Sequence, residues 1–226
     1  MHHVSLNRRL VAELLGTAFL LAVVVGSGIM GDKLSGGSVG LALLANSLAT
    51  GAGLFALILV FGSISGAHFN PAVSLYAAME GHITKREAAL YTVVQIIGGV
   101  LGVYAAHFMF AVPVMEVSQH VRTGASQWWS EFIATFGLLA VIISTSRSDH
   151  TTTPVAVAAY ITSAYWFTSS TSFANPAVTI ARTLTDTFAG IRPMDAPCFI
   201  VMQILGAVAA VVIFRWLYAV RHQAKH

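Results

Sequence analysis

Six long apolar segments, separated by short polar connections, constrain this sequence more than any other feature. Hydrophobic residues make up 56% of its 226 residues, and charged residues make up only 9%. A soluble domain carries roughly 25% charged residues, so this composition cannot cover a surface that faces water. A helix needs about 20 apolar residues to cross a bilayer, and the segments match that length except for a shorter fifth one. They cover residues 10–30, 40–61, 88–110, 129–146, 154–167 and 198–218.

Two further apolar segments, residues 70–79 and 175–184, are too short to cross a bilayer. Each opens with Asn-Pro and follows a stretch of small polar residues, at 62–68 and 169–172. Non-helical backbone at membrane depth is tolerated only where protein buries it or where it lines a wet cavity. The sequence therefore predicts an all-α membrane protein with six transmembrane helices and two re-entrant loops, each followed by a half-helix.

The chain contains an internal repeat. Three motifs occur twice in the same order: an acidic helical segment, an Asn-Pro-Ala triplet and a Gln-containing helical segment. The pairs are residues 12–17 and 130–135, 70–72 and 175–177, and 95–98 and 203–206. We expect one domain, 1–226, with halves at about 1–112 and 113–226. Three spans per half is an odd number, so the second half must insert upside down, with the functional site at the midplane between the halves.

The two Asn-Pro-Ala motifs have the chemistry of helix starts that meet in a pore. Asparagine is a favoured N-cap, and proline at the first helical position lacks an N–H that would have no partner. Two half-helices that meet start to start place positive potential at the centre. Their asparagine side chains offer N–H donors to a water or hydroxyl oxygen, whereas a cation is repelled. The motif residues are Asn70, Pro71, Ala72, Asn175, Pro176 and Ala177.

These motifs together resemble the major intrinsic protein family, the aquaporins and aquaglyceroporins. Residues 12–17, 65–73 and 175–177 carry the resemblance. It implies an aquaporin-like fold, passive flow and a homotetramer with one pore in each subunit. We also expect backbone carbonyl groups of both loops to line the pore, at Gly66, Ala67 and His68 on the inner side and at Ser172, Phe173 and Ala174 on the outer side. His68 is expected to be a hydrogen-bonded wall residue or a pH sensor.

Two carboxylates, Glu13 and Glu131, lie within predicted spans at matching positions of the repeat. Acidic residues inside a membrane are functional candidates, which would fit a proton-coupled secondary transporter. The repeat, like the family resemblance, favours a structural role instead, in which each carboxylate accepts N–H groups from a re-entrant loop.

The resemblance also implies a narrow filter outside the asparagine pair, and counting from the motifs places it at Thr50, Ser163, Ser172 and Val178. The family normally has arginine at the fourth position, where this chain has Val178. All four residues here are small. We therefore expect a wide pore that admits polyols, urea or undissociated metalloid acids, and also small anions or zwitterions. The alternative is a narrow water pore in which neighbouring side chains fill the gap.

Arg182 lies four residues beyond Val178, on the same helical face. Two interpretations are open: Arg182 leans into the outer mouth and partly replaces the lost charge, or it forms an ion pair with Asp186. The segment 178–188 resembles a bacterial branch of the family that lacks the filter arginine and is associated with arsenic resistance.

Charge predicts orientation. Basic residues number eight on the side that holds both termini and four on the other, which predicts cytoplasmic termini in the inner (plasma) membrane.

We expect no enzyme, cofactor, metal or nucleic-acid site, because no nucleophile–base set, metal-ligand spacing, phosphate loop or basic stripe is present. The expected partners are the lipid bilayer, small solutes and further copies of the chain.

Overall fold

The computed structural model describes residues 4–148 and 151–219, and within these ranges the chain forms helices and no strand. This confirms the predicted all-α class. The elements are α1 (Leu6–Leu34), α2 (Val39–Ser65), α3 (Pro71–Met79), α4 (Lys85–Phe110), α5 (Ala125–Ser148), α6 (Thr153–Phe167), α7 (Pro176–Ala181), the 3₁₀ turn η1 (Arg182–Leu184) and α8 (Ala196–Leu217).

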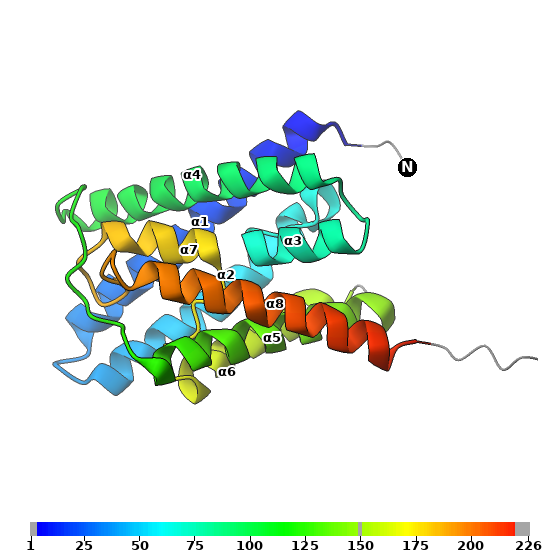
Figure 1. Cartoon of the computed structure of the whole chain (residues 1–226). Helices are drawn as coiled ribbons and strands as arrows, with labels where there is room; N and C mark the ends of the chain where they lie inside the picture. The colour runs from blue at the N-terminus through cyan, green and yellow to red at the C-terminus, as the bar shows by residue number, and fades with distance from the viewer. Residues whose placement is uncertain (1–3, 149–150, 220–226) are drawn as a thin grey trace, which may run out of the picture.

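Five of these helices, α1, α2, α4, α5 and α8, are long and apolar enough to cross a membrane. The fifth segment in the chain, α6, has 15 residues, which gives it a length of about 22 Å. It packs against α2 and α5 and so completes the bundle. The first turns of α1 and the last turns of α8 lie at the same end of the bundle, as six crossings require (Figure 1).

The two half-helices lie in the middle of the bundle, between α4 and α8 (Figure 1). Each begins as predicted: Asn70 Oδ1 accepts a hydrogen bond from the Ala72 N–H, and Asn175 Oδ1 accepts one from the Ala177 N–H. The predicted half-helix 175–184 is α-helical only as far as Ala181, and its last turn tightens into the 3₁₀ turn.

Glycines let the helices of each half cross closely. A side chain at Gly98 of α4 would overlap the carbonyl oxygen of Leu14 in α1. The matching Gly206 of α8 would overlap the carbonyl oxygen of Phe132 in α5. Because the two crossings use the same means, the two halves pack in the same way around the half-helices.

Candidate pore and outer mouth

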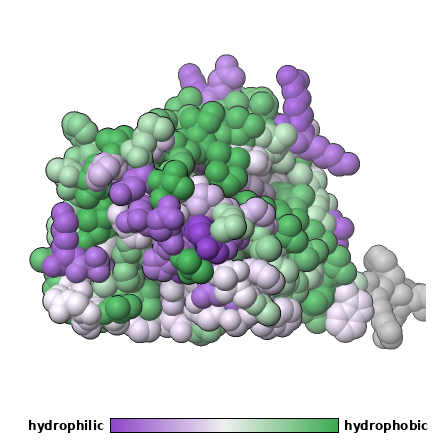
Figure 2. All heavy atoms as spheres, turned by 60° about the vertical axis from the view of Figure 1, so that its left-hand side comes forward, coloured by the Kyte–Doolittle hydropathy of each residue, from purple (hydrophilic) through white to green (hydrophobic). Residues whose placement is uncertain are grey.

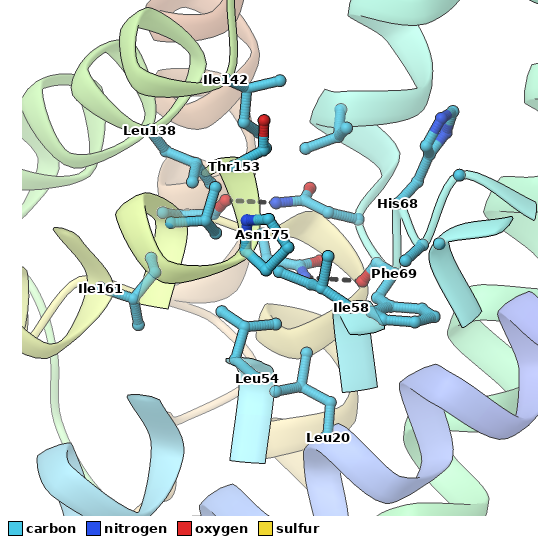
Figure 3. A pocket seen from close by; sticks show the side chains of 18 of the residues that line it. Leu20, Leu54, Ile58, His68, Phe69, Leu138, Ile142, Thr153, Ile161 and Asn175 are labelled. Atoms are coloured by element: carbon cyan, nitrogen blue, oxygen red, sulfur yellow. Dashed lines mark hydrogen bonds between the residues drawn. The ribbon is translucent and has the colours of Figure 1, made fainter. Parts of the chain in front are cut away.

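A cavity of about 640 Å³ runs past both re-entrant loops. Apolar side chains of α1, α2, α5 and α6 form much of its wall, with Asn175 and His68 on the side of the loops (Figure 3). Among the residues that the structure describes, Arg182 is the one Lys, Arg, Asp or Glu in the lining. The wall is therefore mostly apolar, with polar groups confined to the loops and the two ends. The labelled apolar residues are Leu20, Leu54, Ile58, Leu138, Ile142 and Ile161.

The two motif asparagines link the loops across the cavity. Asn70 Nδ2 donates a hydrogen bond to the Ala174 carbonyl at 2.7 Å, and Asn175 Nδ2 donates one to the Phe69 carbonyl at 2.8 Å (Figure 3, dashed lines). An amide nitrogen has two N–H groups. Each asparagine therefore uses one donor to hold the opposite loop and keeps one for a solute, and both side chains line the cavity.

Both loops have the same strained backbone. Ala67 and Phe69 in the first loop have φ of 50° and 49°, and Ser172 and Ala174 in the second have φ of 52° and 48°. This left-handed conformation costs an L-residue roughly 1–2 kcal/mol. It accompanies peptide groups whose N–H groups point into the protein, where buried carboxylates accept them. The loops must be held in place by other contacts.

In the first half, the fully buried Glu13 holds the loop. Its carboxylate accepts hydrogen bonds from the His68 N–H at 2.9 Å and the Phe69 N–H at 2.7 Å. It also accepts one from Ser65 Oγ at 2.6 Å and one from Gln95 Nε2 at 2.8 Å. Four donors thus surround one carboxylate, which leaves it engaged on both oxygens.

In the second half, the fully buried Glu131 has the same position. It accepts hydrogen bonds from the Phe173 N–H at 2.9 Å, the Ala174 N–H at 2.8 Å and Gln203 Nε2 at 2.6 Å. The two carboxylates therefore contact the loops in the way that a structural role requires.

His68 lies on the inner part of the cavity wall. Its Nδ1 is 3.1 Å from Ser74 Oγ, and its ring meets the edge of Tyr91 at a centroid distance of 5.3 Å. Gly66 and Ala67 line the cavity beside it, and Phe173 and Ala174 line the outer part.

The filter position expected at Ser163 is wrong. Thr50, Ser172 and Val178 line the cavity, but Ser163 does not, and its exposed side chain donates a hydrogen bond to the Tyr160 carbonyl at 2.7 Å. The cavity-facing stripe of α6 contains Val157, Ile161 and Tyr165.

Val157, Ile161 and Tyr165 are four residues apart and so lie on one face of α6. Ser163 is two residues from both Ile161 and Tyr165, which places it roughly 200° around the helix from each of them. The sequence distance from the second Asn-Pro-Ala motif, which led to Ser163, does not show which face of α6 points into the cavity. Tyr165 occupies the place instead, with its hydroxyl 3.2 Å from Thr50 Oγ1. The expectation that no bulky residue lies here is therefore also wrong. The spacing of four residues from Val157 to Ile161 and on to Tyr165 could have identified Tyr165 from the sequence, because residues at this spacing share one face of a helix.

Arg182 lies inside the outer mouth. It is 2% exposed, and its guanidinium carbon lies 3.4 Å from the centroid of the Phe173 ring. Its Nε donates a hydrogen bond to the Ala189 carbonyl. The ion-pair interpretation is wrong, because Asp186 accepts instead from the Gln119 N–H at 2.8 Å and the salt bridges of the described residues do not include Arg182.

A second arginine, Arg122, lies near the same aromatic ring. Arg122 comes from the connection between α4 and α5, and its guanidinium carbon is 5.1 Å from the same Phe173 ring centroid. It donates to the carbonyls of Gly190 at 2.7 Å and Ser170 at 3.2 Å. Burial lowers the pKa of Arg122 to about 10, so the side chain is still charged at neutral pH. Hydrophilic residues gather near the middle of this end of the bundle, with hydrophobic residues above them and residues of intermediate hydropathy below (Figure 2).

Known proteins are similar to this chain in sequence and in fold. The model of the major intrinsic protein family matches residues 1–167 and 149–226. The chain is 52% identical over 217 residues to aquaglyceroporin AqpS of Rhizobium meliloti (strain 1021), covering 96% of this chain and 93% of the relative. It is 32% identical over 141 residues to the probable aquaporin TIP2-2 of Oryza sativa subsp. japonica, covering 60% and 56%.

The X-ray structure of the aquaglyceroporin from Plasmodium falciparum has the same fold, with a TM-score of 0.71 at 22% identity and coverage of 93% of this chain and 96% of that one. These matches show that the chain belongs to the major intrinsic protein family, whose members are membrane channels and not enzymes.

Proposed function

We propose that this channel lets small neutral solutes, including water and glycerol-sized polyols, diffuse passively across a membrane. The observation that carries the proposal is the single cavity that passes both Asn-Pro-Ala motifs. The relative that is 52% identical is named an aquaglyceroporin, which supports the same class of solute.

The wall of the cavity suits a solute with hydroxyl groups on one side and carbon on the other. Asn70 and Asn175 offer N–H donors, and the loop carbonyls offer acceptors. The opposite wall is apolar and contacts the carbon side of a polyol. No carboxylate lines the cavity among residues 4–148 and 151–219, so a cation that sheds its water there finds no opposite charge.

We propose that Thr50, Tyr165, Ser172 and Val178, together with Arg182, select the solute at the outer end of the cavity. Val178 gives up the charge and the donors that an arginine would place there. The two hydroxyls of Thr50 and Tyr165 make one side of this end polar. Uncharged metalloid acids and organoarsenical species present hydroxyl groups as polyols do, and we extend the proposal to them.

Reconstituted vesicles test this proposal by stopped-flow light scattering with water, glycerol and arsenous acid. We expect the wild type to pass all three, and Val178→Arg to reduce glycerol uptake about 10-fold, equivalent to about 1.4 kcal/mol in the barrier. A channel only equilibrates a solute. Accumulation driven by an ion gradient would instead show a secondary transporter, and passage of water alone would contradict the wide filter.

We propose that Glu13 and Glu131 serve to hold the loops and do not transfer protons. All of their described contacts are with hydrogen-bond donors of the loops and of two buried glutamines. A proton gradient should therefore leave glycerol uptake unchanged.

We further propose that the chain forms one pore domain, with halves at about 1–112 and 113–226, in a homotetramer. The excess of basic residues favours cytoplasmic termini in the plasma membrane. Two of those residues, Arg221 and Lys225, lie outside the described residues. Native mass spectrometry would measure the number of subunits, and protease access to terminal tags in inverted vesicles would give the orientation.

A further inference from the structure

We propose that the outer end of the cavity contains a binding subsite for a small, singly charged oxyanion, formed by the guanidinium of Arg182 and the hydroxyl of Ser172. Nitrate and short carboxylates have the required chemistry. The inference goes beyond the passage of neutral solutes, and it rests on the proposed function only because the ligand reaches the subsite through the same pore.

Among the residues that the structure describes, Arg182 is a buried cation without a carboxylate partner. Its Nε is held by the Ala189 carbonyl and one face of the guanidinium lies on Phe173. Within residues 4–148 and 151–219, Nη1 and Nη2 of Arg182 donate to no acceptor. Both nitrogens are nevertheless accessible to solvent. Because Arg182 lines the cavity, these N–H groups are open to it. The free edge of a fixed guanidinium matches two oxygens of a planar oxyanion.

Ser172 provides the second, independent observation. Its residue is 3% exposed, its Oγ is sealed from solvent without a hydrogen-bond partner, and it lines the same cavity. Ser172 precedes Phe173, the residue on which Arg182 lies. A buried hydroxyl without a partner is rare in native proteins. Rotation of the Ser172 side chain to another rotamer would turn Oγ toward the cavity, where a bound oxygen atom would accept its proton.

The charges around the subsite favour an anion. Arg122 adds a second positive charge near the Phe173 ring. The neighbouring carboxylates are engaged: Asp186 with the Gln119 N–H, Asp195 with the Arg122 N–H and Arg192, and Glu131 with the second loop. A small anion therefore complements the charge of this outer mouth.

Nitrate is a suitable probe, because it is charged at every accessible pH and does not cross lipid as a neutral acid. Thermal unfolding of the purified full-length protein in detergent would be followed as potassium nitrate replaces potassium gluconate at constant ionic strength. A ligand that binds the folded state raises Tm in a saturable way. We expect this rise in the wild type and in Arg192→Gln, a matched arginine that pairs with Asp195 and does not line the cavity.

Substitutions at the subsite should weaken the binding of nitrate. We expect Arg182→Gln to weaken it at least about 10-fold, as loss of a charged hydrogen bond does, and Ser172→Ala to weaken it about 3-fold. Arg182→Lys keeps the charge and should retain part of the affinity. If Arg182→Gln does not fold, Arg182→Lys and Ser172→Ala still decide the matter.

A second measurement separates this subsite from the proposed function. Nitrate should reduce glycerol uptake by the wild-type protein in vesicles with the same midpoint that the Tm titration gives, and this inhibition should be lost in Arg182→Gln. A shift in Tm that is equal in every variant, or none in the wild type, would overturn the subsite. Absence of glycerol uptake in all of them would contradict only the proposed function, because the Tm titration needs no transport.

Discussion

The two re-entrant loops share one scaffold but differ in what they present to the pore. Each is held by a buried carboxylate and a buried glutamine, each has left-handed non-glycine residues one and three positions before its asparagine, and each ends in that asparagine as a helix cap. The residue two positions before that asparagine differs: His68 in the first loop and Phe173 in the second. The repeat thus preserves the contacts that hold the backbone and leaves the side chains in the pore free to differ.

The half-helices differ as well. α3 runs for nine residues, whereas α7 has six and then tightens into the 3₁₀ turn. That early end brings Arg182 back over Phe173, where it becomes part of the outer mouth. Among the described residues, the second half-helix is therefore followed by a charged residue that lines the cavity, whereas the first is not.

The largest effect should come from the carboxylates. Glu13→Gln replaces an acceptor of four hydrogen bonds with a group that can accept at only one oxygen. We expect a loss of about 3 kcal/mol or more in the free energy of unfolding, measured by denaturation in mild detergent.

Glu131→Gln should cost about 1 kcal/mol less, because Glu131 accepts from three donors and Ser170 Oγ, which matches Ser65 Oγ, is not among them. Equal losses for the two variants would show that the extra serine contact is unimportant. A small loss in both would contradict the structural role altogether.

The close crossings should respond equally in both halves. Gly98→Ala and Gly206→Ala each insert a methyl group against a backbone carbonyl, which must force two helices apart. We expect each to destabilise the protein by about 1–3 kcal/mol. Thermal unfolding of both variants would measure this, and Gly62→Ala, where a methyl group meets open space, is the control.

The outer mouth should respond to the size of Tyr165 but not to Ser163. Tyr165→Ser removes a ring from the cavity wall next to Thr50, and we expect glycerol uptake to rise a few-fold, equivalent to under about 1 kcal/mol in the barrier. Ser163→Ala lies on the opposite face of α6 and should leave uptake unchanged. A change in uptake for Ser163→Ala alone would restore Ser163 to the filter.

The smallest effect concerns His120 in the outer connection. Burial lowers its pKa below the usual value, and the charges of Arg122 and then Arg182 lower it further. Arg182→Gln should therefore raise the pKa of His120, which an NMR titration of the labelled imidazole would detect. Because the pKa is lowered in the folded state, His120 disfavours folding as the pH falls below 6.5 and does not do so above it. A pKa that does not respond would mean that Arg182 is neutralised by another group.

Most of the fold could be predicted because it depends on local signals. Apolar length located the spans, and asparagine followed by proline located both half-helix starts to within a residue. The predicted segment 10–30 is shorter than α1 because both ends of this helix contain polar residues, which a search for apolar segments leaves out. Three repeated motifs were enough to predict two matching halves.

The site was less predictable because it depends on helical face and on contacts between distant segments. Counting along the chain led to Ser163, but the rotation of α6 places Tyr165 on the cavity. The sequence placed Arg182 and Asp186 one turn apart, yet their partners are Ala189 and Gln119. Arg122 reaches the outer mouth from a connection with no regular structure.

The sequence by itself therefore determined the membrane environment, the inverted repeat, the two helix starts and the absence of an arginine at position 178. These follow from composition and from short-range chemistry, which act wherever the residues occur. Only the tertiary structure decided that Tyr165 borders the cavity and that Arg182 lies on Phe173, outside every ion pair of the described residues. Those outcomes depend on how the helices rotate and where their ends meet, which packing fixes only after all of the segments are in place.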